Sequence, residues 1–284
     1  MESVVSTQWL AHSLNAPDLV IVDATYNSLS PTKDDRAAYE ACHIPGAVFM
    51  ALGAYIDEIS RLLLLLPTPK SFKQAAEALG IREDSRIVIY DNSPLHSSAR
   101  AWWMMRTFGV RNVGILDGGL AKWIREGRPL DTGTPEPASG QFTPSLNRGF
   151  VRELDDIRRN LIEGNAQLVD TRRREHFQGI APDPRGLASG HIPRSKNVPY
   201  HLLFEADGTY RALGSLESIF AAEGVTLDAP IIATCGSGMS AATVLLAAHL
   251  LGARDLALYN ASWSEWGALA DTPKRMGPGF HDEP

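Results

Sequence analysis

Residues 230–241 read PIIATCGSGMSA, and the fold class can be predicted from them. The apolar run Ile231 to Thr234 is typical of a buried strand in a parallel sheet. Two glycines then allow the chain to turn tightly around Cys235, and the alanine- and leucine-rich residues 240–251 favour a helix. The stretch therefore predicts a strand, a glycine loop and a helix, which is the repeating unit of an α/β sheet.

The same pattern occurs earlier in the chain, so the sequence repeats itself once. Four pairs of segments correspond in the same order: VDA at 22–24 with VDT at 169–171, HIP at 43–45 with HIP at 191–193, RIVIYD at 86–91 with PIIATC at 230–235, and FGV at 108–110 with LGA at 251–253. Their offsets stay between 143 and 148 residues. This regularity predicts two copies of one domain, each of ordinary domain size.

Each copy alternates short apolar strands with helical stretches. We therefore predict an α/β fold of two tandem domains, each a parallel sheet flanked by helices on both faces. The predicted strands are 19–22, 87–90, 113–116, 168–170, 231–234 and 256–259, and the predicted helices are 71–79, 97–108, 120–126, 216–223, 240–251 and 263–269. Residues 128–149 are proline-rich and aperiodic, as expected of a linker. We place the boundary near residue 140, between domains 1–139 and 140–284.

Composition narrows the possible partners. The 27 basic and 33 acidic residues give a net charge of −6, without the basic excess typical of nucleic-acid binding. The purely apolar run 62–66 is far shorter than the ~20 residues of a membrane span. Residues 1–32 contain no Lys or Arg, unlike a signal sequence, so we expect a cytoplasmic protein.

Two cysteines, Cys42 and Cys235, can form neither a disulfide scaffold nor a structural zinc site, and no metal is expected.

The two copies differ where chemistry is expected. Ligands of parallel sheets bind at the carboxyl ends of strands, and there one copy has Asp91 and the other Cys235. The glycine loop can aim backbone N–H groups at the Cys235 sulfur, and the helix start adds about half a positive charge. Both effects favour a thiolate over the alternative of an inert buried thiol. Cys42 has no such loop, and we interpret it as an ordinary helical residue.

A thiolate in such a loop supports phosphate-ester hydrolysis or sulfur transfer. Cysteine phosphatases need an arginine six positions after the nucleophile, but this chain has Ala241 there and no basic residue in 236–241. In sulfur transfer the thiolate takes a sulfur atom as a persulfide and then passes it to a nucleophilic acceptor. The loop therefore favours sulfur transfer, with a non-catalytic sulfur carrier as an alternative of another class.

From Val5 to about Trp266 the chain resembles the tandem-domain rhodanese sulfurtransferases. The resemblance rests on the HIP motif at His43 and at His191, on DGGLAKW at 117–123, and on CGSGMSA at 235–241, where the family more often has Val and Thr in place of Met239 and Ser240. It implies a catalytically silent first domain, because Asp91 cannot form a persulfide. It also implies an active site in the cleft between the domains, at the Cys235 loop, with no organic cofactor.

The charge of the loop predicts the donor. Thiosulfate-specific relatives carry Arg and Lys after the nucleophile, whereas Gly236 and Ser237 stand there in this chain. The uncharged loop resembles the branch of the family that takes sulfur from 3-mercaptopyruvate and releases pyruvate, with a thiosulfate:cyanide sulfurtransferase as the alternative. Cyanide, a small thiol or thioredoxin is the expected acceptor.

The resemblance also implies roles for individual residues. Arg185 matches a substrate-binding arginine of the family, and Arg194 is a second candidate. The donor loop comprises Gly236, Gly238, Met239 and Ser240. A proton relay would join Ser237, His43 and either Asp34 or Asp35. A structural role is the alternative for His43, because the same motif recurs at His191.

Two further patterns have simpler interpretations. Trp263 and Trp266 lie at helical spacing, which favours a place in the core over contact with substrate. Residues 172–174 are all arginine, and we interpret this run as solvated. Its position at a strand end could nevertheless add positive potential near the cleft.

Overall fold

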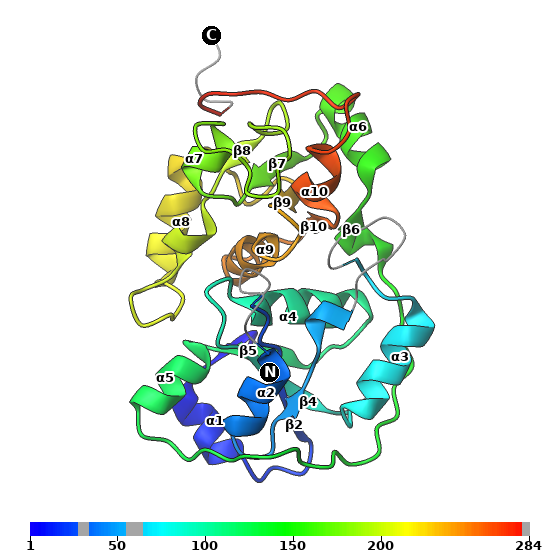
Figure 1. The fold of residues 1–284 in the computed structure, drawn as a ribbon, viewed down its shortest axis with the longest axis vertical. Coiled ribbons are helices and arrows are strands. Elements are labelled where there is room, and N and C mark those ends of the chain that lie inside the picture. Colours follow the sequence, from blue (N-terminus) through cyan, green and yellow to red (C-terminus); the bar gives the residue numbers. More distant parts are fainter. Residues whose placement is uncertain (28–33, 55–64, 280–284) are drawn as a thin grey trace. The chain divides into compact units, whose positions relative to one another are not determined.

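The computed structural model describes residues 1–27, 34–54 and 65–279. The chain forms two compact units (Figure 1). Among the described residues, the first comprises 1–27, 34–54, 66–147 and 206–210, and the second comprises 65, 148–205 and 211–279. The apolar run 62–66 lies partly outside the described residues. No helix in the described part of the chain is both long and apolar enough to cross a membrane, and no cluster of metal-ligating side chains occurs there.

The first unit is built on a parallel five-stranded sheet in the order β1-β5-β4-β2-β3. Its strands are β1 Val4–Val5, β2 Leu19–Asp23, β3 Val48–Phe49, β4 Arg86–Tyr90 and β5 Val113–Leu116. Its helices are α1 Thr7–Ser13, α2 Asp35–Ala41, η1 Leu52–Ala54, α3 Pro69–Ala78, α4 Ser97–Thr107 and α5 Gly119–Arg125.

Helices cover both faces of this sheet, as β4 illustrates. Val88 and Tyr90 belong to a core cluster that also holds side chains of α1, α2 and α5. Ile87 and Ile89 alternate with them and are also fully buried, and α4 packs against the same strand. A strand buried on both faces needs the continuous apolar run that the sequence supplies.

The second unit repeats this architecture in the order β6-β10-β9-β7-β8, again all parallel. Its strands are β6 Val151–Arg152, β7 Gln167–Asp170, β8 Lys196–Asn197, β9 Ile231–Thr234 and β10 Leu256–Tyr259. Its helices are η2 Arg148–Phe150, α6 Leu154–Glu163, α7 Arg174–Phe177, η3 Tyr200–Leu203, α8 Leu213–Ala222, α9 Ala241–Leu250 and α10 Ser262–Trp266. The identical strand order confirms the predicted α/β fold with two copies of one domain.

Burial directly tests the predicted core position of the two tryptophans. Trp263 and Trp266 are fully buried in the core beside Ile157 of α6, so their predicted core position is confirmed. The predicted linker 128–149 contains only η2 at its end and isolated bridges at Asp131 and Gln141.

Candidate active site

Cys235 directly follows β9, and its loop leads into α9. The Gly238 N–H donates to the Cys235 sulfur at 3.1 Å. Gly238 has a φ of +80°, a conformation that a residue with a side chain rarely adopts. The predicted inward-pointing amide is therefore present at Gly238. Cys235 is only 2% exposed, so its thiol is shielded from bulk water.

The turn between β10 and α10 holds this loop in place. The Cys235 N–H donates to the Ser262 hydroxyl at 3.1 Å, and this hydroxyl donates to the Tyr259 carbonyl at 2.8 Å. The Trp263 N–H donates to the Cys235 carbonyl at 3.0 Å. Ser262 has a φ of +53°, which is unusual for a residue other than glycine. Ser262 was not predicted from the sequence. The repeat could have revealed it, because its counterpart Gly119 also has a positive φ, +56°.

Arg185 reaches the same loop, where the resemblance places a donor-binding arginine. Its Nη1 donates to the Gly236 carbonyl at 2.9 Å and to the Ser264 hydroxyl at 2.6 Å. Its Nε and Nη2 donate to the two carboxylate oxygens of Asp183 at 3.0 and 2.7 Å. The structure therefore brings Arg185 to the Cys235 loop, held there by Asp183.

The Asp183–Arg185 pair is partly shielded from water. Burial by itself raises the pKa of Asp183, but the hydrogen bonds and positive charge of Arg185 outweigh it, and the pKa lies below its usual value. Asp183 is therefore ionised at neutral pH and balances the charge of Arg185. Neither Asp183 nor Ser264 was predicted, because both contacts arise from the tertiary fold.

The other loop residues pack into the domain. Met239 is 2% exposed, and the Ser240 hydroxyl lies 3.1 Å from that of Thr171, which follows β7. Ser237 is half-buried, next to the glycine whose N–H contacts the sulfur. Of the loop side chains, Ser237 is therefore better placed than Met239 or Ser240 to meet a donor.

The interpretation of the arginine run as solvated is wrong for Arg172. This side chain is 9% exposed, donates to both carboxylate oxygens of Asp170 and lies 4.3 Å above the Trp263 ring. Its positive charge balances the carboxylate of Asp170, which is itself only 1% exposed. Arg173 and Arg174 are exposed, as predicted, and Arg174 pairs with Glu223.

Arg194 lies at the other end of the second sheet. Its Nη1 donates to the Leu161 carbonyl at 2.9 Å, and its guanidinium lies beside Gly164, in the connection that leads into β7. The amino end of β7 is at this side, whereas Cys235 follows the carboxyl end of β9, which runs parallel to it. The structure therefore does not bring Arg194 to the Cys235 loop.

The candidate relay residues of the first unit have defined local roles. The His43 Nδ1 lies 2.9 Å from the Tyr39 carbonyl, and its ring stacks on Tyr39 at 4.4 Å. His191 makes the equivalent pair of contacts with Phe177, at 2.8 and 3.8 Å. The match between the copies gives His43 a structural role, while its buried Nε2 has no hydrogen-bond partner among the described residues.

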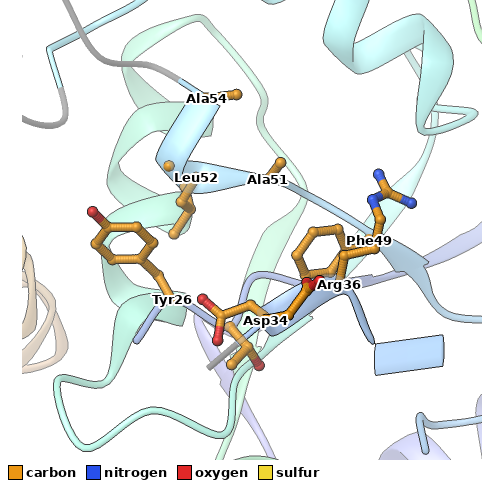
Figure 2. Close-up of a pocket in the computed structure, with 10 residues that line it drawn as sticks. Tyr26, Asp34, Arg36, Phe49, Ala51, Leu52 and Ala54 are labelled. Carbon is orange, nitrogen blue, oxygen red and sulfur yellow. The ribbon is translucent and has the colours of Figure 1, made fainter. Parts of the chain in front are cut away.

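Asp34 and Asp35 can be told apart by their surroundings. Asp34 caps α2 by accepting the Ala37 N–H at 3.1 Å. It also lines a cavity of about 510 Å³ together with Tyr26 (Figure 2). The Asp35 carboxylate is engaged by the backbone and side-chain N–H groups of Asn27 at 2.9 and 2.7 Å.

Comparison with known proteins agrees with the repeated fold and the cysteine loop. The model of the rhodanese-like domain matches this chain twice, at residues 6–126 and 153–269. The chain belongs to the rhodanese family. The range between the two matches contains the predicted boundary near residue 140.

Several relatives of this rhodanese are similar over nearly their whole length. It is 41% identical over 273 residues to 3-mercaptopyruvate sulfurtransferase of Escherichia coli K12, covering 95% of this chain and 96% of the relative. It is 37% identical over 271 residues to the human protein of the same name, covering 93% and 91%. It is also 37% identical over 285 residues to thiosulfate sulfurtransferase of Rattus norvegicus, covering 98% and 96%.

The fold is also similar to that of a solved structure. The crystal structure of SseA from Escherichia coli, described as a 3-mercaptopyruvate sulfotransferase, superimposes with a TM-score of 0.85 at 38% identity. The match covers 93% of this chain and all of that one.

The first rhodanese domain fills the equivalent loop differently. The Asp91 carboxylate accepts the N–H groups of Ser93 at 2.8 Å and Ser98 at 2.9 Å, the latter at the start of α4. The Leu120 N–H donates to the Asp91 carbonyl at 3.0 Å, as Trp263 does to Cys235. The loop framework is therefore the same in both copies, and in the first a carboxylate already occupies its amide donors.

Proposed function

We propose that this rhodanese is a sulfurtransferase that carries the sulfur of 3-mercaptopyruvate on Cys235 as a persulfide. The observation that carries the proposal is the Gly238 N–H directed at the Cys235 sulfur, in a loop without a basic side chain in 236–241. An amide donor stabilises sulfur anions without adding the positive charges that thiosulfate would require. Support also comes from the relatives named 3-mercaptopyruvate sulfurtransferase in Escherichia coli and human.

The proposed reaction has two steps. The Cys235 thiolate attacks the donor sulfur, the carbon–sulfur bond breaks, and the electron pair leaves on pyruvate as its enolate, which takes a proton. A nucleophilic acceptor then attacks the outer sulfur of the persulfide, the sulfur–sulfur bond breaks, and the Cys235 thiolate is restored. No electrons are gained or lost outside these bonds, so the cycle needs no redox cofactor.

Nearby side chains have proposed parts in this cycle. Arg185, fixed by Asp183, is proposed to hold the oxygens of the donor, because it contacts the loop backbone at Gly236. Ser237 is proposed to supply the proton for the enolate. The first domain, with Asp91 at the equivalent strand end, is proposed to be catalytically silent. Arg194 is left out of the proposed donor site because of its position.

The acceptor and the cellular location are also part of the proposal. Cyanide, a small thiol or thioredoxin would each present a nucleophile able to attack a persulfide. A cytoplasmic location is proposed because a catalytic thiol needs a reducing compartment. The alternative donor is thiosulfate, in line with the relative from Rattus norvegicus named thiosulfate sulfurtransferase.

A donor comparison tests the proposal. The purified protein is assayed with 3-mercaptopyruvate or thiosulfate and cyanide as acceptor, and kcat/KM is compared. We expect 3-mercaptopyruvate to be preferred, with pyruvate released over many turnovers. A preference for thiosulfate would favour the alternative, and a single turnover would favour a sulfur carrier.

Three substitutions test the assigned roles of Cys235 and Arg185. Treatment with donor should add the mass of one sulfur atom to the wild type and to Cys42→Ser, but not to Cys235→Ser. Arg185→Gly should raise the donor KM by about 10- to 100-fold, the value expected for a charge-assisted hydrogen bond. Sulfur found on Cys42, or an unchanged KM, would contradict the assignments.

A further inference from the structure

Arg185 has little capacity left for a donor. A guanidinium has five N–H groups, and four of those of Arg185 are engaged by the described residues Asp183, Gly236 and Ser264. One N–H on Nη2 remains, and Asp183 balances the positive charge. A two-point grip on a carboxylate, the geometry that arginine usually supplies, is therefore not available from Arg185 alone.

A second arginine lies at the same edge of the sheet. Arg173 is two residues beyond Thr171, whose N–H donates to the Thr234 carbonyl at 2.9 Å, directly before Cys235. The Thr171 hydroxyl also contacts Ser240 of the Cys235 loop at 3.1 Å. The segment that carries Arg173 is thus attached at two points to the strand and loop that carry the nucleophile.

The backbone of Arg173 is fixed, and its side chain is exposed. Its carbonyl accepts the N–H groups of His176 and Phe177 at 3.1 and 3.0 Å, at the start of α7. Its two neighbours are neutralised, Arg172 by Asp170 and Arg174 by Glu223. Among the described residues no carboxylate lies within salt-bridge distance of Arg173, so it keeps its full positive charge.

Tyr200 is attached to the segment that carries Arg173. Its N–H donates to the Thr171 carbonyl at 3.0 Å, and η3, which it begins, packs against α9. Burial raises the pKa of Tyr200, the charge and hydrogen bond of Arg173 lower it, and the Cys235 charge raises it. As a neutral phenol it can orient the Arg173 guanidinium without cancelling its charge.

We propose that Arg173, oriented by Tyr200, is a second anchor for the carboxylate of an α-keto acid donor at the Cys235 loop. The donor class rests on the proposed function. The anchor itself rests on the position of Arg173 and on the single N–H that Arg185 has left. Because the carboxylate takes no part in bond breaking, the anchor stabilises the bound donor and the transition state equally. Its loss should therefore raise KM and leave kcat nearly unchanged.

Steady-state kinetics with 3-mercaptopyruvate at saturating acceptor test the anchor. Arg173→Ala should raise KM by about 10- to 100-fold with kcat within about threefold. Arg173→Lys should recover part of this loss because it keeps the charge, and Tyr200→Phe should cause a smaller rise. Arg174→Ala is the matched control, since this neighbouring arginine is exposed and paired with Glu223, and it should leave KM unchanged. An unchanged KM in Arg173→Ala, or an equal rise in Arg174→Ala, would overturn the proposal.

A binding measurement separates this proposal from the proposed function. Pyruvate carries the same carboxylate, and its affinity for Cys235→Ser can be measured by calorimetry without turnover. Adding Arg173→Ala should weaken pyruvate binding, whereas adding Arg174→Ala should not. If the wild type releases no pyruvate from 3-mercaptopyruvate, the proposed function is wrong. The comparison of pyruvate affinities still tests whether Arg173 binds the carboxylate. Equal affinities with and without Arg173 would refute it.

Discussion

Replacing Ser262 by alanine and by glycine should reverse the usual order of stability of these two residues. Both changes remove the hydroxyl that accepts the Cys235 N–H and donates to the Tyr259 carbonyl. The lost bonds and the buried, unpaired Cys235 N–H cost about 2–4 kcal/mol in either variant. The two variants differ only in how they tolerate the φ of +53° at this position.

The size of that difference follows from the backbone. In an ordinary helix or strand, glycine is less stable than alanine by about 0.5–1 kcal/mol because it loses more conformational freedom on folding. In the left-handed region a residue with a side chain is destabilised by roughly 1–2 kcal/mol, whereas glycine is not. The balance predicts that Ser262→Gly is more stable than Ser262→Ala by about 0.5–1 kcal/mol. The equivalent position of the first domain, Gly119, already has the residue that this balance favours.

Chemical denaturation of the full chain, with the midpoints of the variants compared under one protocol, measures the difference. Ser218 provides the control because it is exposed within the ordinary helix α8. There Ser218→Ala should be more stable than Ser218→Gly. If glycine is less stable than alanine at both positions, Ser262 carries no backbone strain and the reasoning is wrong. Both Ser262 variants should also slow persulfide formation, because both release the Cys235 amide from its anchor.

Three further predictions concern other parts of the two domains. Asp183→Asn should raise the donor KM several-fold in steady-state assays and largely spare kcat, because Arg185 loses the carboxylate that orients it; an unchanged KM would remove Asp183 from the site. Burial lowers the pKa of His191, so the unfolded chain binds more protons below pH ~6.5 and stability falls as the pH falls. Thermal unfolding between pH 8 and 5.5 should show a steeper loss for the wild type than for His191→Gln, and equal slopes would contradict this. Gly119→Ala should lower the melting temperature strongly, since its Cβ would lie 2.4 Å from the Asp91 carbonyl oxygen at a φ of +56°, and a wild-type melting temperature would refute that clash.

The central strands were predictable from sequence because burial on both faces demands apolar runs. The predicted strands 113–116, 231–234 and 256–259 agree residue for residue with β5, β9 and β10. The edge strands β1, β3, β6 and β8 have two residues each, too few to show any periodicity, and were missed. Helix α3 begins two residues before the predicted start because Thr68 accepts the Ser71 N–H and Pro69 fits the first turn.

Local chemistry was easier to predict than tertiary contacts. The Cys235 loop carries its own glycines and helix start, so its character follows from neighbouring residues. The partners Ser262, Ser264 and Asp183 come from distant segments, and no local pattern marks them. The failure of Arg194 has a simpler cause, since a residue directly before a strand lies at the amino end of a parallel sheet. Arg185 precedes the same strand, but it lies farther from β8, in a loop that reaches across to the other end.

The contrast between the two loops goes beyond the exchange of cysteine for aspartate. In register with Cys235 and Gly238, the first domain has Asp91 and Pro94. Proline has no N–H, so the donor that faces the sulfur in the second domain has no counterpart in the first. There the carboxylate takes N–H groups from Ser93 and Ser98 instead. A cysteine placed at position 91 would therefore lack a counterpart of the Gly238 amide, and we expect it not to support the proposed persulfide chemistry.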